Sequence, residues 1–136
     1  MTSTPPLVLL LVEDDAGHAT LFERTLRRGG MTNTLIRFSD GEQVLTFLRE
    51  GGRRLEKRYV LVLDLNLPRI GGLDVLRDLR EDPDPGLANL PAMVLSTTGN
   101  PEEAEEARTL GCYEFLSKPV DFEGFLTALD GLGIGR

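Results

Sequence analysis

Residues 7–15 read Leu-Val-Leu-Leu-Leu-Val-Glu-Asp-Asp. Six apolar residues in a row, preceded by Pro5-Pro6, predict a strand that is covered on both faces. Three acids follow at once, so they lie at the carboxyl end of that strand. In an open parallel sheet, binding and catalytic groups collect at this end. This stretch therefore predicts both a buried strand and an acidic site beside it.

The rest of the chain repeats the same alternation of apolar strands and amphipathic helices. Four more strands are predicted at residues 34–38, 59–63, 92–95 and 113–116. Five helices are also predicted. The first covers residues 16–28, the second runs from the capping-box sequence at 39–42 to about residue 50, and the third follows Gly71-Gly72. The fourth covers residues 101–110, and the fifth runs from Asp121 to about residue 129. Residues 81–91 hold three prolines and are predicted to form a loop. We expect an α/β protein with a doubly wound, flavodoxin-like parallel sheet of five strands in the order 2-1-3-4-5 and five helices.

Length and composition limit the class of protein. The 136 residues predict a single domain with its core at about 7–130 and no attached output domain. The net charge of −7 argues against binding to nucleic acid or to an anionic membrane surface. No apolar run is long enough to span a membrane, and the single cysteine, Cys112, excludes an intrachain disulfide. A soluble, cytoplasmic protein is expected.

Polar residues stand at the carboxyl ends of four predicted strands. Glu13 and Asp14 follow the first, Asp64 the third, Ser96 the fourth and Lys118 the fifth. In the expected order, the first and third strands are neighbours, so Glu13, Asp14 and Asp64 converge. Three carboxylates in contact repel one another unless a cation intervenes, and oxygen ligands with few protein contacts suit Mg²⁺. Any one of these residues alone would be an ordinary surface or strand-end group, but their coincidence at one edge predicts a site.

Such a site suits phosphoryl transfer, which depends on positioning and on charge neutralisation. A divalent cation lets a carboxylate nucleophile approach an anionic phosphoryl group. Lys118 supplies a second positive charge, and the hydroxyl of Ser96 can donate to a phosphoryl oxygen.

The motifs resemble those of the CheY-like receiver domains of two-component response regulators. The matching segments are Leu-Val-Glu-Asp at 11–14, Asp-Leu-Asn-Leu-Pro at 64–68 with Gly71-Gly72, Leu-Ser-Thr at 95–97 and Phe-Leu-Ser-Lys-Pro at 115–119. The resemblance implies that Asp64 accepts a phosphoryl group from a sensor histidine kinase in a Mg²⁺-dependent reaction and that Lys118 pairs with Asp64 and then with the phosphoryl group. It also implies the metal ligands Asp14, Asp64 and the backbone carbonyl of Asn66, with Glu13 acting through water. Ser96 and Phe115 would form the switch pair, and the chain would be a phosphoacceptor that catalyses only its own phosphorylation and dephosphorylation.

The pattern at 64–69, the long 82–91 loop and the residues around Ser96 and Lys118 look most like regulators associated with phytochrome-type histidine kinases. This implies a kinase of the bacteriophytochrome type and an unknown downstream protein as partners. Members of that group often self-associate, so a homodimer is a hypothesis for this chain.

Three other functions have to be compared with this one. A flavin- or nucleotide-binding protein would carry a Gly- or Ser/Thr-rich phosphate loop after its first strand, where this chain has acids. A phosphatase with an aspartate nucleophile would have a second aspartate two residues later, where Asn66 stands. A receiver-fold interaction module that works without phosphorylation is the remaining alternative. His18 is predicted to be a solvated or kinase-docking residue, Cys112 a packing residue, and the basic run at 53–58 a solvated loop.

Overall fold

The fold is described from a computed structural model, which covers residues 5–53, 56–97 and 99–134. Its strands are β1 (Leu7–Val12), β2 (Leu35–Phe38), β3 (Arg58–Asp64), β4 (Ala92–Ser96) and β5 (Glu114–Ser117). Its helices are α1 (Ala16–Arg28), α2 (Gly41–Arg49), α3 (Gly72–Arg80), α4 (Pro85–Ala88), α5 (Pro101–Thr109) and α6 (Phe122–Gly131).

The five strands form one parallel sheet in the order β2-β1-β3-β4-β5, which confirms the predicted topology. All six residues of β1 are buried, and so are the last six residues of β3. These two strands pair from Leu7 opposite Arg58 to Val12 opposite Leu63. The register therefore brings the carboxyl ends of β1 and β3 side by side.

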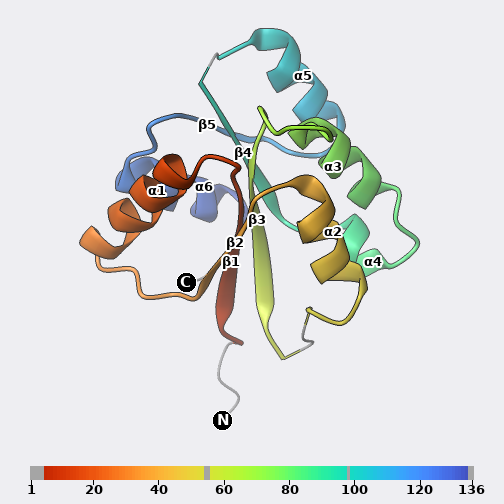
Figure 1. Cartoon of the computed structure of the whole chain (residues 1–136), viewed down its shortest axis with the longest axis horizontal. Coiled ribbons are helices and arrows are strands. Elements are labelled where there is room, and N and C mark those ends of the chain that lie inside the picture. Colours follow the sequence, from red (N-terminus) through yellow and green to blue (C-terminus); the bar gives the residue numbers. More distant parts are fainter. Residues whose placement is uncertain (1–4, 54–55, 98, 135–136) are drawn as a thin grey trace.

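Helices cover both faces of the sheet (Figure 1). On one face, α1 and α6 pack on one apolar core, where the rings of Phe22 and Phe125 meet edge to face with centroids 5.5 Å apart. On the other face, α2, α3, α4 and α5 pack on a second core that includes Val44, Leu76 and Ala107. A doubly wound sheet of this kind leaves its strand ends uncovered, so a site can form at the edge between the two layers.

Most helices begin with a side-chain cap that the sequence supplies. In each case a side-chain oxygen of the capping residue accepts a hydrogen bond from a backbone N–H of the first turn. The capping residues are Asp15, Asp40, Asp84, Asn100 and Asp121. At α2 the cap is Asp40, which accepts from the N–H of Gln43, and the side chain of Gln43 in turn accepts from the N–H of Ser39. The reciprocal pair is thus formed with Gln43 rather than with Glu42, one residue later than the sequence predicted.

The residues that the structure describes form six helices where five were predicted, and the predicted fold class is confirmed. The additional helix, α4, lies in the segment predicted to be a loop. Asp84 caps it through the N–H of Gly86, and Pro85 occupies its first turn, where a proline costs no hydrogen bond. This helix has a single turn, and its Leu87 is buried in the second core. The bounds of β1 match the prediction, those of the other four strands differ from it by one residue at one or both ends, and Arg58 belongs to β3 rather than to a loop.

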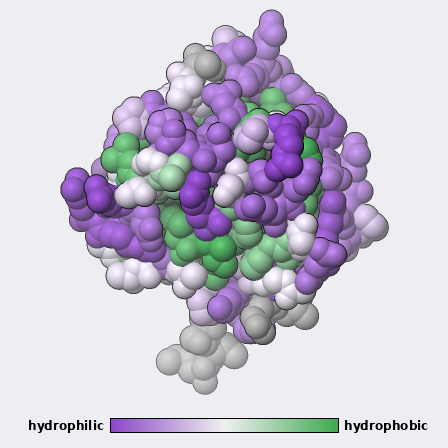
Figure 2. Space-filling model, viewed as in Figure 1, coloured by the Kyte–Doolittle hydropathy of each residue, from purple (hydrophilic) through white to green (hydrophobic). Residues whose placement is uncertain are grey.

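The surface in this view is mostly hydrophilic, with a smaller apolar area near its centre (Figure 2). Over the part of the chain that the structure describes, the helices are too short or too polar to cross a bilayer.

Candidate functional site

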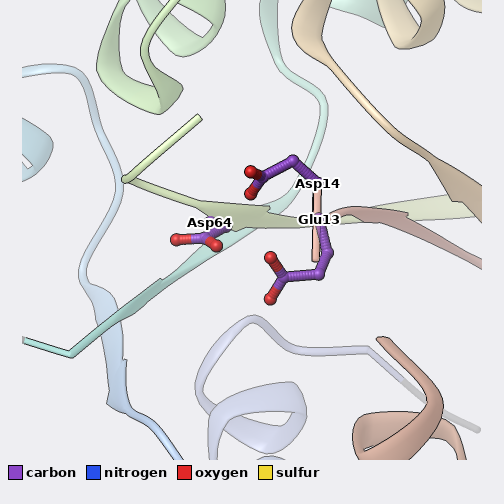
Figure 3. Close-up of side chains that lie close together, drawn as sticks. All are labelled: Glu13, Asp14 and Asp64. Atoms are coloured by element: carbon purple, nitrogen blue, oxygen red, sulfur yellow. The ribbon is translucent and has the colours of Figure 1, made fainter. Parts of the chain in front are cut away.

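Three carboxylates meet at the carboxyl edge of the sheet. Glu13 and Asp14 follow β1 directly, and Asp64 is the last residue of β3. One oxygen from each lies within 4.8 Å of the others, and Figure 3 shows the side chains of Glu13 and Asp14 extending toward Asp64. Glu13 and Asp64 are each only 2% exposed, whereas Asp14 is exposed. The pairing of β1 with β3 therefore brings together the three acids that the strand order predicts to converge.

Lys118 is the cation of this cluster. Its ammonium lies 2.5 Å from Oε1 of Glu13 and 3.0 Å from Oδ2 of Asp64. The residue follows β5 at the end of the sheet, and its backbone N–H donates to the carbonyl of Ser96 on β4. The peptide bond between Lys118 and Pro119 is cis. Lys118 thus links the end of β5 to the ends of β1 and β3.

Close backbone packing fixes the chain that follows Asp64. The backbone N–H of Asn66 donates to Oδ1 of Asp64 over 3.0 Å. At Gly72, the first residue of α3, an added Cβ would lie 2.4 Å from the carbonyl oxygen of Asp64 and 2.9 Å from Cα of Leu65. Only glycine leaves room for this approach, so the start of α3 is packed directly on the backbone of Asp64.

Burial and mutual contact shift the pKa values of the three charged groups. Burial raises the pKa of Glu13, and the adjacent Asp64 raises it further, against the effect of Lys118. Burial also works against ionisation of Asp64, but contacts with Glu13, the Asn66 amide and Lys118 outweigh it and lower its pKa. For Lys118 burial opposes the charge, and its hydrogen bonds to Glu13 and Asp64 outweigh burial, so its pKa is raised. Asp64 is therefore held as a carboxylate beside an ammonium ion.

The remaining predicted residues lie around this centre. Ser96 ends β4 and is 1% exposed. Phe115, on β5, is partly buried against the core that α2 to α5 cover. Asn66 and Thr97 approach each other across the edge, where Nδ2 of Asn66 donates to the Thr97 hydroxyl over 3.3 Å. The structure places all of these residues at or next to one edge of the sheet, while their roles stay predictions.

His18 is the residue that sequence reasoning missed. Its side chain is 51% exposed, in agreement with the prediction of a solvated residue, but Nδ1 of its ring also lies 3.1 Å from Nζ of Lys118 and 3.7 Å from Oε1 of Glu13. A contact between residues 100 positions apart has no signature in local spacing. The signal available was indirect, since residue 18 lies in the first turn of the helix that begins beside the acids.

The donor set at this edge fits a hard divalent cation. Glu13, Asp14 and Asp64 offer carboxylate oxygens only, and the exposed position of Asp14 leaves room for water ligands. Asp64 is an anion that Lys118 orients, with the small hydroxyl side chain of Ser96 nearby on the adjacent strand. The arrangement can bind a cation and hold a carboxylate nucleophile beside two positive charges.

Comparison of the sequence with known proteins identifies a family and several relatives. The family model for the response regulator receiver domain matches residues 9–130. The probable methanogenesis regulatory protein FilR2 of Methanothrix harundinacea is 37% identical over 120 residues, which cover 87% of this chain and 76% of that protein. Response regulator Rcp1 of Synechocystis is 30% identical over 132 residues, covering 96% of this chain and 88% of that protein.

Solved structures with the same fold include a bacteriophytochrome response regulator and a metal-bound response regulator. The bacteriophytochrome response regulator RtBRR has a TM-score of 0.78 and 34% identity, covering 95% of this chain and 79% of its own. The Mn²⁺-bound form of Rcp1 has a TM-score of 0.70 and 29% identity, covering 93% of this chain and 91% of its own. In that Rcp1 structure a divalent cation, Mn²⁺, is bound to a protein of this fold.

Proposed function

This chain belongs to the response regulator receiver domain family, and on that premise we propose that Asp64 is its phosphoacceptor. The observation that supports this role most directly is the buried Asp64 carboxylate beside Lys118 and two further acids. The donor would be the phosphohistidine of a sensor histidine kinase. A carboxylate oxygen of Asp64 bonds to phosphorus while the bond between phosphorus and the histidine nitrogen breaks, and that nitrogen keeps the electron pair. The product is an acyl phosphate on Asp64 and an unmodified histidine on the kinase.

Mg²⁺ is the proposed cofactor. Asp14, Asp64 and the backbone carbonyl of Asn66 would be its ligands, and Glu13 would act through water. When bound, the ion neutralises negative charge that would otherwise keep an anionic phosphoryl group away from three carboxylates. Lys118 holds Asp64 in place before transfer and pairs with the phosphoryl oxygens afterwards.

Ser96 and Phe115 are the proposed switch. The Ser96 hydroxyl would donate to a phosphoryl oxygen, and the ring of Phe115 would turn into the space that Ser96 leaves. Phe115 is only partly buried, so turning its ring would disturb fewer packed contacts than moving a fully buried side chain. New charge-assisted hydrogen bonds would stabilise one of two arrangements of β4 and β5.

Phosphorylation is proposed to change the surface with which this chain binds another protein. The chain would catalyse only its own phosphorylation and dephosphorylation. The likeness to the bacteriophytochrome response regulator RtBRR supports a kinase of the bacteriophytochrome type as the phosphodonor. The downstream partner would be a protein, and self-association to a homodimer is part of the same hypothesis.

The decisive experiment is the intact mass of the protein after incubation with Mg²⁺ and acetyl phosphate. We expect the mass of one phosphoryl group to be added to the wild-type chain, and no addition in the Asp64→Asn variant or in the presence of EDTA. Asn keeps the shape of the side chain but cannot act as the nucleophile, so it is the matched control.

A wild-type chain with no adduct would then be treated with beryllofluoride, which imitates the phosphoryl group without depending on its lifetime. A Mg²⁺-dependent change in the amide spectrum would support the proposal. The absence of both responses in folded protein would favour the interaction module that works without phosphorylation.

A further inference from the structure

His18 contacts the site from α1 but takes no part in the reaction proposed above. Its ring nitrogen Nδ1 lies 3.1 Å from Nζ of Lys118, and half of its side chain, 51%, is exposed. The backbone of His18 is fixed in the first turn of α1, where its N–H donates to the Asp15 carboxylate over 3.0 Å. The ring is therefore held at the outer side of the lysine by the start of a capped helix.

The chemistry of the two groups fixes the direction of the contact. A lysine ammonium has three hydrogen-bond donors and no acceptor, so Nδ1 of His18 must accept. The ring hydrogen is then on Nε2, and the ring is neutral in this arrangement. In the alternative, a positively charged His18 ring would form an ion pair with Glu13 over 3.7 Å. The charged ring would then lie against the ammonium of Lys118. The shorter distance and the charge balance both favour acceptance from Lys118.

In the part of the chain that the structure describes, His18 adds a third acceptor around Lys118. The other two acceptors are Oε1 of Glu13 and Oδ2 of Asp64. The pocket beside the contact is lined mainly by apolar side chains, including those of Leu11, Phe22, Leu95 and Val120. The ammonium therefore meets few competing acceptors on this side, and each of its three donors has a defined partner.

The three acceptors differ in what phosphorylation would do to them. Both carboxylates belong to the proposed metal and phosphoacceptor cluster, so their hydrogen bonds to Lys118 must change when that cluster binds other groups. His18 takes no part in that exchange. We propose, on the basis of the function proposed above, that His18 is a positioning residue that holds Lys118 at the site while its carboxylate partners change.

Amine labelling can test the contact without any phosphorylation. The chain has two lysines, Lys118 and the exposed Lys57, so each can be followed by peptide mass spectrometry, with Lys57 as an internal reference. The variants are His18→Ala, which removes the ring, His18→Phe, which keeps the bulk without an acceptor, and His18→Asn, whose Oδ1 can take the place of Nδ1. Thr20→Ala, an exposed change on the same helix, is the control.

We expect Lys118 to be labelled faster than in the wild type when His18 is Ala or Phe, by about two- to tenfold, the range that one hydrogen bond of ordinary strength gives. The Asn and Thr20→Ala variants should stay near the wild-type rate. If Phe protects as well as histidine while Asn does not, the ring only shields the lysine, and the proposal fails. Equal labelling in all variants would also overturn it.

The second measurement is the rate of phosphoryl uptake from acetyl phosphate with Mg²⁺. The Ala and Phe variants should react about two- to tenfold more slowly, and Asn should restore the rate. Changed labelling with unchanged uptake would overturn the positioning role. A wild-type chain that takes up no phosphoryl group would instead overturn the proposed function, and the labelling would still decide whether His18 holds the lysine.

Discussion

The two helix layers both pack on apolar cores, but they differ in helix length and in the contacts between their helices. The layer of α1 and α6 consists of longer helices, of 13 and 10 residues, whose contact centres on the fully buried ring of Phe125 against Phe22. The layer of α2 to α5 consists of helices of nine residues or fewer. Arginines tie this second layer together: Arg49 contacts Asp78 and Asp82, Arg77 pairs with Glu106, and Arg80 binds three backbone carbonyls.

Short helices are marginal by themselves, so they depend on contacts with their neighbours. Apolar packing is costly to rearrange because movement opens a cavity, whereas a surface ion pair can exchange partners at little cost. The loops that carry Glu13 and Lys118 lead into the first layer, and those that carry Asp64 and Ser96 lead into the second. Glu13 and Lys118 therefore precede helices of the first layer, and Asp64 and Ser96 precede helices of the second, so the acidic cluster lies between the two layers.

The largest effect on stability should come from a substitution in the apolar core under α1 and α6. Phe125→Ala removes a fully buried ring, and we expect the free energy of unfolding to fall by about 3–5 kcal/mol. Urea unfolding measures this loss. Tyr113→Ala, at a side chain that is 72% exposed, is the control and should change stability by less than about 0.5 kcal/mol. A loss at Phe125 no larger than at Tyr113 would contradict the central place of Phe125 in the first core.

An intermediate effect should follow from removing the central tie of the second layer. Arg80 donates to the carbonyls of Leu110, Ala88 and Leu90 and so joins α3 to the ends of α4 and α5. Arg80→Ala leaves these carbonyls without their charged donor, and we expect a loss of about 2 kcal/mol in unfolding free energy. Arg80→Lys keeps the charge but not the forked geometry, so it should recover only part of the loss. Full recovery by lysine would show that charge alone matters.

The smallest effect on stability should come from Asp82, in the second layer, and it should depend on pH. The N–H of Asp84 and, after it, the guanidinium of Arg49 lower the pKa of Asp82. A carboxyl whose pKa is lowered by folding stabilises the fold above its unfolded-state pKa, near 4, and loses that contribution as the pH falls through the folded-state value.

The measurement is the unfolding free energy of the wild type and of Asp82→Asn across this range. The difference between them should be constant from about pH 7 to 5 and should shrink in more acidic solution. A difference that grew on acidification would contradict the lowered pKa.

Local patterns predicted most of the elements. The range of α1 was predicted correctly because Asp15 caps it, its apolar residues repeat at helical spacing, and glycines follow it. The strand order followed from five apolar strands separated by helices. Cys112 was predicted to be a packing residue and is 2% exposed. The one-turn helix α4 was missed because three prolines suggested a loop, although Asp84-Pro85 is also a helix start.

The candidate site was only partly predictable. The strand ends identified Glu13, Asp14, Asp64, Ser96 and Lys118, since the ends of parallel strands share one edge. The pairing of Arg53 with Asp84 was missed, because the two residues belong to segments that only the packed helices bring together.

The sequence by itself determined which residues are buried in strands, where the helices begin, and which side chains stand at the active edge. These properties depend on local periodicity, capping and the alternation of elements, all of which can be read along the chain. The pairing of Lys118 with Asp64 was implied by the resemblance, but the tertiary structure alone decided that Lys118 also contacts Glu13 and His18, and that arginines join the short helices. Such contacts depend on distances between residues far apart in sequence, which packing fixes and spacing does not encode.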